Sequence, residues 1–497
     1  MEQEEQQSDN LKHKLAGTIK WNAIDRVATQ ILYAVTGIVL ANLLSKADFG
    51  LVGAIGIFQA FATLFVDSGF NAALIQRKNP TKLDYSTVLW FNLTTATAIY
   101  IILFMAAPYI AELFENDRRL IPLSRVMFLT FIINAAAIVQ TNLLVKQMQV
   151  KMIAVSNSVA LIASAAVGIW LAVAGYGAWA IVWQSVTLST VKTVILWATS
   201  AWRPLMQFSM ASLRSFFRFG SGVVASAFLN VAFQEIYSFF IGNRVGLVAL
   251  GYYNQAHKWS RMGIASISQM LSTSFLPALS AVQDDAARFA AAVRKMNRFT
   301  AYLLFPALGL LGVMATPIFH TLFGTKWDGA IPLFQILLVR GVFTVLQSNY
   351  NSYIMALGRS RLMMITELLR DGAAAVAIAV TLPYIALSRP DSITAGLEIF
   401  LWGQLAASVI TWAVTVWLTA PLCHLRRRSF ITDLLPALGV TVLSLVPAGM
   451  LAAVVSSPLL LCCAEVLAAA VLYLGINAAA GSGIQREVIS SLIHRGK

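Results

Sequence analysis

Long apolar stretches follow one another along almost the whole of this 497-residue chain. A helix needs about 20 apolar residues to cross the hydrocarbon core of a bilayer, and polar, Gly or Pro breaks divide the chain into about fourteen such stretches. Lipid offers no hydrogen bonds to an exposed backbone, so each span is expected to be helical. The predicted spans lie near residues 19–44, 49–76, 83–113, 119–145, 150–174, 176–199, 216–242, 247–281, 296–323, 329–357, 361–387, 394–422, 431–455 and 458–480.

The composition agrees with this interpretation. Hydrophobic residues make up 58% of the chain and charged residues 12%, whereas a soluble domain carries about 25% charged residues. The first apolar run is too long for the core of a signal peptide, so we expect no cleavable one. The sequence predicts an all-α polytopic membrane protein.

The connections between the spans differ in charge. With the N-terminus placed in the cytoplasm, Lys and Arg in the inside connections outnumber those outside by roughly four to one. Cytoplasmic loops collect such residues, so both termini are predicted to be cytoplasmic. The same bias explains the net charge of +14 without a nucleic-acid partner.

The sequence shows no motif for a cofactor, a metal or catalysis. Cys423, Cys462 and Cys463 lie in or beside apolar segments, which indicates neither a disulfide framework nor a metal site. No phosphate-binding GxxxxGK[ST] loop, HExxH or CxxC motif is present. We therefore expect a protein that is not an enzyme and has no cofactor. Transport would draw on an ion gradient, on substrate flow or on another protein.

Two pairs of segments resemble each other at an offset of about two hundred residues, which is typical of repeat-built transporters. "NLLSKADFG" begins at Asn42 and "NRVGLVALG" at Asn243, and both open the next helix at a glycine. "VKQMQVK" similarly resembles "ALGRSR". Chance similarity between apolar stretches is the alternative.

A repeat predicts two pseudo-symmetric six-helix lobes followed by two further helices. The expected segments are a cytoplasmic N-terminal tail (1–18), an N-lobe (19–199), a cytoplasmic linker (200–215), a C-lobe (216–422), two extra helices (423–480) and a cytoplasmic C-terminal tail (481–497).

Charged residues inside the predicted spans are the strongest candidates for a site, because each costs about 2.5–3.5 kcal/mol at the bilayer centre. The cations are Arg26, Arg125, Lys192, Lys258, Arg261, Arg340 and Arg370. Some have ordinary explanations. Lys192 is near enough to a helix end to snorkel, and Arg370 can pair with Glu367 and Asp371 on its own helix.

The stretch "YYNQAHKWSRMGIAS" is harder to explain in this way. Lys258 and Arg261 share a helix face and lie roughly 15–20 Å along their helix, near mid-membrane. Glu235 on the preceding helix can pair with one of them but not both, and a structural pair is the alternative. Unpaired cations favour a water-filled, positive cavity that receives an anion. Arg340 is at a similar depth. The acids Asp25, Asp67 and Glu235 are candidates for ion coupling or for pairing.

Several segments resemble a known family. "IGNRVGLVALGYYNQAHKWSRM", "FLPALSAVQDDAARFAAAVRKM", "LFGTKWDGAIPLFQILLV", "YIMALGRSRL", "SKADFGLVGAIGIF" and "DSGFNAALIQRKN" resemble the signatures of bacterial polysaccharide transporters, or O-antigen flippases. This family lies within the multidrug/oligosaccharidyl-lipid/polysaccharide exporter superfamily. The matches run over roughly residues 15 to 365, and the last two helices are generic.

The resemblance implies two lobes around a V-shaped cavity in the bacterial inner membrane. It implies movement of undecaprenyl-diphosphate-linked oligosaccharides for O-antigen, capsule or exopolysaccharide assembly, with membrane lipids and polysaccharide polymerase machinery as further partners. A cationic cavity suits a diphosphate, since Arg binds phosphate through bidentate hydrogen bonds. We expect Arg26, Lys258 and Arg261 to contact the headgroup, followed by Arg340.

Three alternatives remain. A multidrug exporter of the same superfamily would favour carboxylates in its cavity, because its substrates are commonly cationic. A membrane polymerase or ligase would usually carry a large external loop, and every predicted outside loop here is short. A flippase for the peptidoglycan precursor lipid II would share the fold, and the local motifs look more like the polysaccharide branch.

Overall fold

The structure is a computed structural model that describes residues 2–67, 74, 77, 80–385 and 393–494. Within its helices, the side chains of residues 2–20, 23, 67, 216–226, 360, 393–394, 489 and 491–494 are not described. All regular secondary structure in the described ranges is helical. The predicted all-α class is therefore confirmed.

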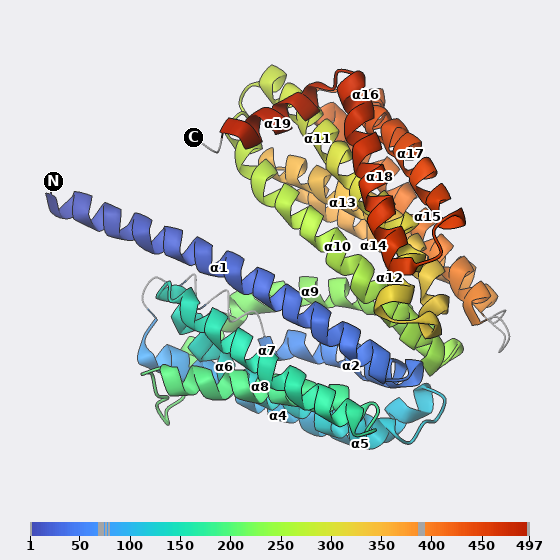
Figure 1. Cartoon of the computed structure of the whole chain (residues 1–497). Coiled ribbons are helices and arrows are strands. Elements are labelled where there is room, and N and C mark those ends of the chain that lie inside the picture. Colours follow the sequence, from blue (N-terminus) through green and yellow to red (C-terminus); the bar gives the residue numbers. More distant parts are fainter. Residues whose placement is uncertain (1, 68–73, 75–76, 78–79, 386–392, 495–497) are drawn as a thin grey trace. The chain divides into compact units, whose positions relative to one another are not determined.

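The described chain divides into two compact units, residues 1–251 and 252–497. Unit 1 contains α1 (Glu2–Leu43), α2 (Lys46–Asp67), α4 (Lys82–Leu113), α5 (Leu120–Met127), α6 (Leu129–Lys146), α7 (Val150–Val173), α8 (Trp179–Thr199), α9 (Met210–Arg244) and the first residues of α10 (Leu247–Ser280). Within this unit α1 packs on α7, α7 on α8, α8 on α6 and α6 on α4, as Figure 1 shows.

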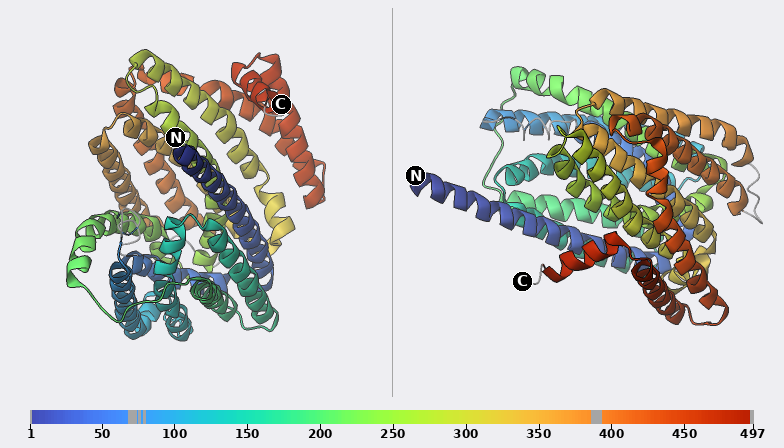
Figure 2. Two further views of the ribbon diagram at one scale, coloured as in Figure 1. Left: turned by 90° about the vertical axis from the view of Figure 1, so that its left-hand side faces the viewer. Right: turned by 90° about the horizontal axis from the view of Figure 1, so that it is seen from above.

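Unit 2 contains the rest of α10 and a second helical bundle. Its helices are α11 (Ala286–Val313), α12 (Ala315–Leu322), η1 (Thr325–Ala330), α13 (Ile331–Ala356), α14 (Ser360–Ile385), α15 (Ile393–Leu422), α16 (Arg427–Thr432), α17 (Leu435–Met450), η2 (Leu451–Ala453), α18 (Pro458–Ala479) and α19 (Gly483–His494). Neighbours pack in the order α14, α15, α13, α11, α17 and α18. Figure 2 gives two further views of the chain, in which the yellow to red helices belong to this unit. The lobe and tail boundaries drawn from the sequence remain predictions.

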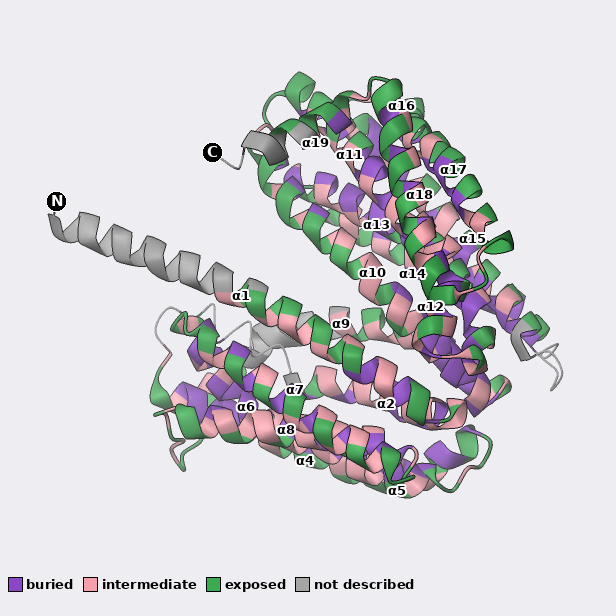
Figure 3. Cartoon of the chain, in the orientation of Figure 1, coloured by how far each residue is buried: buried purple, intermediate pink, exposed green. Residues whose placement is uncertain are grey.

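Twelve helical segments of the described residues are long and apolar enough to cross a membrane. Large apolar side chains stay exposed along them, such as Met105, Trp170 and Val471, each about two-thirds exposed. Figure 3 shows exposed positions along the helices rather than only at their ends. In water such a surface would be unfavourable, so these faces are expected to contact lipid.

The helices predicted near 216–242 and 247–281 are present as α9 and α10, yet neither is among these twelve. For α9 the described side chains cover only part of the helix. The whole of α10 is described, and it is long enough to cross a membrane, but its residues are not apolar enough for a candidate span. The predicted number of about fourteen spans is therefore not confirmed.

The repeated glycines Gly50 and Gly251 meet inside unit 1. A Cβ on Gly50 would lie 1.8 Å from the Leu247 carbonyl oxygen, and a Cβ on Gly251 would lie 2.1 Å from the Lys46 carbonyl oxygen. Each glycine thus faces the start of the helix that carries the other. This reciprocal contact has the form of a local two-fold axis, and only glycine permits such close approach.

Candidate functional site

The first turn of α10 is held by a carboxylate from elsewhere in unit 1. Gly246 has φ +115°, a conformation that favours glycine, and it precedes the helix. The Leu247 N–H, one of the unpaired donors of a helix start, donates to Glu115 Oε2 at 2.9 Å. A negative charge at a helix N-terminus is favourable. The start of α10 is therefore fixed in place.

Further along α10, Lys258 and Arg261 are both exposed. The Lys258 Nζ lies 5.4 Å from the centre of the Trp259 ring, within the range of a cation–π contact. The Trp259 indole N–H donates to Gln255 Oε1 at 3.0 Å. Within unit 2, no carboxylate of a described residue forms an ion pair with Lys258 or Arg261.

Arg370 shows the opposite behaviour. Its guanidinium lies 2.5 Å from a Glu367 oxygen and 2.9 Å from an Asp371 oxygen. The predicted pairing of these three residues on α14 is confirmed. A cation paired in this way carries little net charge for a ligand, and Arg370 is not a site candidate.

Arg261 and Arg340 gather around His257 in unit 2. Both guanidinium groups interact electrostatically with the His257 ring, which stacks on Tyr253 at 5.4 Å with an angle of 18° between the rings. A Cβ on Gly341 would lie 2.3 Å from an Ile264 side-chain carbon, so α13 packs directly on α10 beside Arg340. Two of the four predicted headgroup residues therefore lie close together.

In unit 1, Asp25 and Arg26 occupy neighbouring positions of α1 with different surroundings. Arg26 is exposed, whereas Asp25 is half-buried. The Asn157 amide donates to both Asp25 oxygens at 3.3 and 3.2 Å. Asp25 also attracts the Lys192 ammonium. Asp25 is thus part of a polar group made by α1, α7 and α8.

Lys192 also lines a cavity of about 290 Å³ inside unit 1. Three helices, α2, α6 and α8, form its walls. The lining residues are Thr63, Val66, Phe131, Asn134, Ala137, Ile138, Thr141, Asn142 and Lys192. Hydroxyl, amide and ammonium groups around an open space suit a polar or anionic ligand. Sequence reasoning missed this cavity.

The structure gives less information about the remaining two predicted site residues, Glu235 and Asp67. Glu235 is half-buried on α9 in unit 1. Its predicted pairing with Lys258 or Arg261 stays a prediction. Asp67 ends α2, and its side chain lies outside the described ones.

These features define a class of protein, a polytopic membrane protein of the transporter type. The candidate site lies on α10, which is less apolar than the twelve candidate spans. The match of residues 39–332 to the family model described as "Polysaccharide biosynthesis protein" goes further. The chain belongs to that family, which confirms the resemblance seen in the sequence motifs.

Curated relatives agree with this assignment. The chain is 25% identical over 423 residues to the teichuronic acid biosynthesis protein TuaB of Bacillus subtilis (strain 168), covering 84% of each chain. It is 24% identical to the lipopolysaccharide biosynthesis protein WzxC of Escherichia coli (strain K12), covering 82% of this chain and 85% of that one. The succinoglycan biosynthesis transport protein ExoT of Rhizobium meliloti (strain 1021) is 25% identical over 73% of each.

Solved structures show the same fold at lower identity. The lipid II flippase MurJ, in an inward closed conformation, has a TM-score of 0.69 and 13% identity, covering 93% of this chain and 99% of that one. An inward-facing multidrug resistance transporter of the MATE family, in the MOP superfamily, has a TM-score of 0.59 and 14% identity, covering 80% and 94%. The predicted superfamily fold is therefore confirmed.

Proposed function

We propose that this protein moves an undecaprenyl-diphosphate-linked oligosaccharide across the bacterial inner membrane, with both termini in the cytoplasm. The family and the relatives in lipopolysaccharide, teichuronic acid and succinoglycan biosynthesis support a role in polysaccharide assembly. The observation that carries the proposal is the exposure of Lys258 and Arg261 on α10 without a carboxylate partner among the described residues of unit 2.

The chemistry of the substrate explains why such cations are useful. The diphosphate of a lipid-linked sugar is anionic and cannot enter hydrocarbon unaided, while its polyprenyl tail can stay there. Within unit 2, Arg261 and Arg340 would bind phosphate oxygens through paired N–H donors, and Lys258 would act as a compact positive charge. The contact of Arg26 with the headgroup stays a prediction. The polymerase machinery is the expected consumer of the flipped unit.

Lys192, which the sequence analysis explained by snorkelling, is added to the proposed binding residues. Its cavity offers hydroxyl and amide groups to the sugar and an ammonium to phosphate. Asp25 attracts that ammonium. We further propose that Asp25, with Asp67 and Glu235, takes part in ion coupling, since a carboxylate inside the membrane can exchange its cation during alternating access.

The test is transport by the purified full-length protein in proteoliposomes. A fluorescent oligosaccharide on undecaprenyl diphosphate is added to the vesicles, and dithionite bleaches whatever reaches the outer leaflet. We expect wild type to expose the inner-leaflet pool. The rate should fall at least about tenfold in Lys258→Gln and Arg261→Gln, the loss of one charged hydrogen bond. Lys295→Gln is the matched control, because Lys295 is an exposed cation that is already paired with Glu487.

The outcomes separate the alternatives. No movement of the lipid-linked sugar by wild type, or full rates in both α10 variants, would refute the proposal. Faster movement of lipid II than of the oligosaccharide carrier would place the protein in the peptidoglycan branch. Movement of a cationic dye without movement of either lipid would favour drug export.

A further inference from the structure

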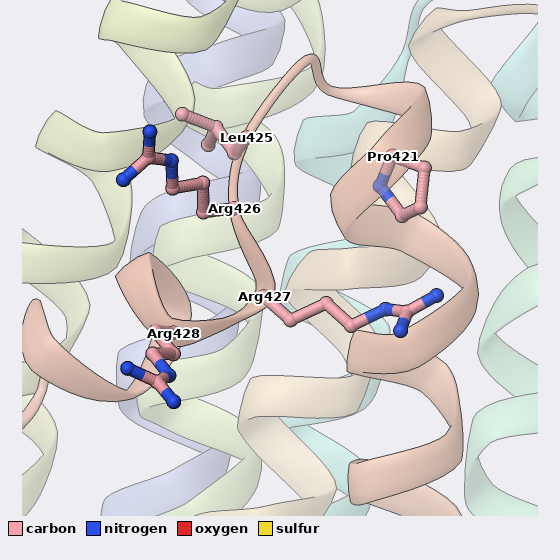
Figure 4. A pocket seen from close by; sticks show the side chains of 5 residues that line it. All are labelled: Pro421, Leu425, Arg426, Arg427 and Arg428. Carbon is pink, nitrogen blue, oxygen red and sulfur yellow. The ribbon is translucent and has the colours of Figure 1, made fainter.

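Two turns in unit 2 place five exposed arginines beside two clefts. Arg359 lies in the turn between α13 and α14, and Arg361 lies at the start of α14. Arg426 lies in the turn between α15 and α16, and Arg427 and Arg428 begin α16. One cleft, of about 490 Å³, is lined by Gly358, Arg359, Arg361, Leu362, Ile365 and Leu422. The other, of about 520 Å³, is lined by Pro421, Leu425, Arg426, Arg427 and Arg428 (Figure 4). The clefts are neighbours, because Pro421 and Leu422 are consecutive residues of α15.

Both turns are fixed by the same backbone motif at a helix C-terminus. After α13, Gly358 has φ +67°, and the N–H groups of Gly358 and Arg359 donate to the carbonyls of Met355 and Ile354 at 2.9 and 3.1 Å. This is the paired hydrogen-bond pattern of a Schellman motif. The arginines that follow are therefore held close to the helix end.

The end of α15 repeats the motif with a residue other than glycine. His424 has φ +53°, and the N–H groups of His424 and Leu425 donate to the carbonyls of Pro421 and Ala420 at 3.1 and 3.0 Å. Arg426 follows directly. In Figure 4, Arg427 extends toward α15, and Arg426 and Arg428 lie on the other side of the turn.

The five guanidinium groups have no carboxylate partner among the described residues. Elsewhere in unit 2 the chain does neutralise arginines, since Arg294 and Arg298 both bind Asp433. The one cation–π contact in the group places Arg427 over the Trp417 ring at 4.7 Å. The clefts therefore keep their positive charge.

The position along the helices indicates what the charge faces. Of the apolar segments able to cross a membrane, two end at these turns and two begin there: Thr325–Ala356, Arg361–Ile385, Ala395–Leu422 and Arg427–Ala453. The arginines thus lie where hydrocarbon gives way to headgroups. Ile365 and Trp417 are about half exposed within the adjoining spans.

We propose that these clefts bind anionic phospholipids of the surrounding bilayer, such as phosphatidylglycerol. Guanidinium groups would hold the lipid phosphate through paired hydrogen bonds, and the acyl chains would lie along exposed apolar side chains such as Ile365 and Trp417. This site is separate from the proposed transport of a polyprenyl diphosphate. Each arginine that contacts the headgroup in these clefts is expected to contribute about a fivefold gain in affinity for the bound anionic lipid.

The test is native mass spectrometry of the purified full-length protein titrated with phosphatidylglycerol or phosphatidylcholine of matched chains. We expect wild type to retain phosphatidylglycerol preferentially. The triple variant R426Q/R427Q/R428Q and the double variant R359Q/R361Q should each lose at least about tenfold in affinity for it. R426K/R427K/R428K, which keeps the charge, should retain most binding. R118Q/R203Q/R214Q removes three exposed arginines elsewhere and should behave as wild type.

Each alternative result would overturn the proposal. Equal retention of the two phospholipids would show that charge does not select the lipid. Loss in R118Q/R203Q/R214Q equal to that in R426Q/R427Q/R428Q would show a general charge effect instead of a site. Tight binding of undecaprenyl phosphate that phosphatidylglycerol does not displace would make the clefts part of the substrate path. A normal thermal unfolding midpoint in each variant excludes misfolding as the cause.

Discussion

Replacing Gly50 or Gly251 by Ala tests how closely the starts of α2 and α10 must approach. Real Cβ atoms essentially never come within 3.0 Å of a neighbouring heavy atom, yet the added carbon would lie 1.8 Å from the Leu247 oxygen in Gly50→Ala and 2.1 Å from the Lys46 oxygen in Gly251→Ala. The obstacles are backbone carbonyls, which cannot rotate away. The helix starts must therefore separate by about 1 Å, which forfeits a quarter to a half of the dispersion energy at the crossing.

We expect each single variant to lose about 1–3 kcal/mol of unfolding free energy, the usual cost of overpacking. Gly56→Ala is the matched control, because a Cβ at Gly56 on the same helix meets nothing within 4 Å. Removing a helical glycine there should be neutral or stabilising by up to about 1 kcal/mol. The measurement is reversible unfolding in mixed detergent micelles by titration with dodecyl sulfate.

The double variant distinguishes a shared crossing from two separate clashes. Once the first Cβ has pushed the helices apart, the second finds part of its space already open. The two losses should therefore sum to at least about 0.5 kcal/mol more than the loss in the double variant. Strictly additive losses would show that the two glycines do not share one contact. Stability of Gly50→Ala equal to that of Gly56→Ala would refute the whole argument.

Three further predictions concern charges. Asp433→Asn should destabilise the protein by about 1.5–3 kcal/mol, because the buried carboxylate accepts hydrogen bonds from both Arg294 and Arg298 at 2.7–3.1 Å. The control is Lys295→Met, which breaks only an exposed pair with Glu487. It should cost less than about 1 kcal/mol in the same unfolding titration. Lys192→Met should slow transport in the proteoliposome assay at least about tenfold, which corresponds to the loss of one charged contact, and Lys192→Arg should retain part of the rate. A wild-type rate in Lys192→Met would show that the cavity beside Lys192 does not bind the substrate. Arg370→Gln should lower the unfolding midpoint, since it leaves Glu367 and Asp371 without their cation, whereas Arg261→Gln should leave the midpoint unchanged.

The helices could be predicted from the sequence because lipid imposes one rule on every span. The breaks inside them were not predicted. The span predicted at 119–145 is divided into α5 and α6 at Phe128, and the one at 296–323 into α11 and α12 at Met314. No local signal in the first run marks its break at Phe128. In the second run a signal was present, because Pro317 lacks the N–H that would donate to the Val313 carbonyl. Phe128 is fully buried, which is a tertiary effect, and it stacks on Phe131 at 5.5 Å.

The ends of the chain differ from the prediction for a related reason. α1 extends back to Glu2 through the expected polar tail, and α19 forms within the segment expected to be a C-terminal tail. Polarity excludes a residue from lipid and does not prevent a helix. Hydropathy therefore predicts the apolar part of a span, and it does not predict where the helix that contains it ends.

The candidate site was predictable only where one helix carried it. Lys258 and Arg261 share a face of α10, so their spacing alone identified them. The cavity beside Lys192 depends on α2, α6 and α8, which are far apart in sequence. A signal was nevertheless present, because Asn134, Thr141 and Asn142 are spaced to lie on one face of an apolar helix. A polar face within a predicted span was the pattern to look for.

The composition of α10 and its lack of ion pairs lead to the same interpretation. Most helices of this chain satisfy lipid with apolar residues, and several cations of unit 2 are neutralised: Arg370 on its own helix, and Arg294 and Arg298 by Asp433. The sequence is thus able to supply carboxylates where a cation needs one. On α10 it places Lys258 and Arg261 without a carboxylate partner among the described residues of unit 2, and the Ser, Thr and Gln residues of the same helix lower its apolar character further. An unpaired cation in a membrane helix is costly, and a single substitution could remove it. Such a cation is expected to be kept where a ligand provides the missing negative charge. We therefore propose that an anionic ligand of α10 supplies the negative charge that the described residues of unit 2 do not.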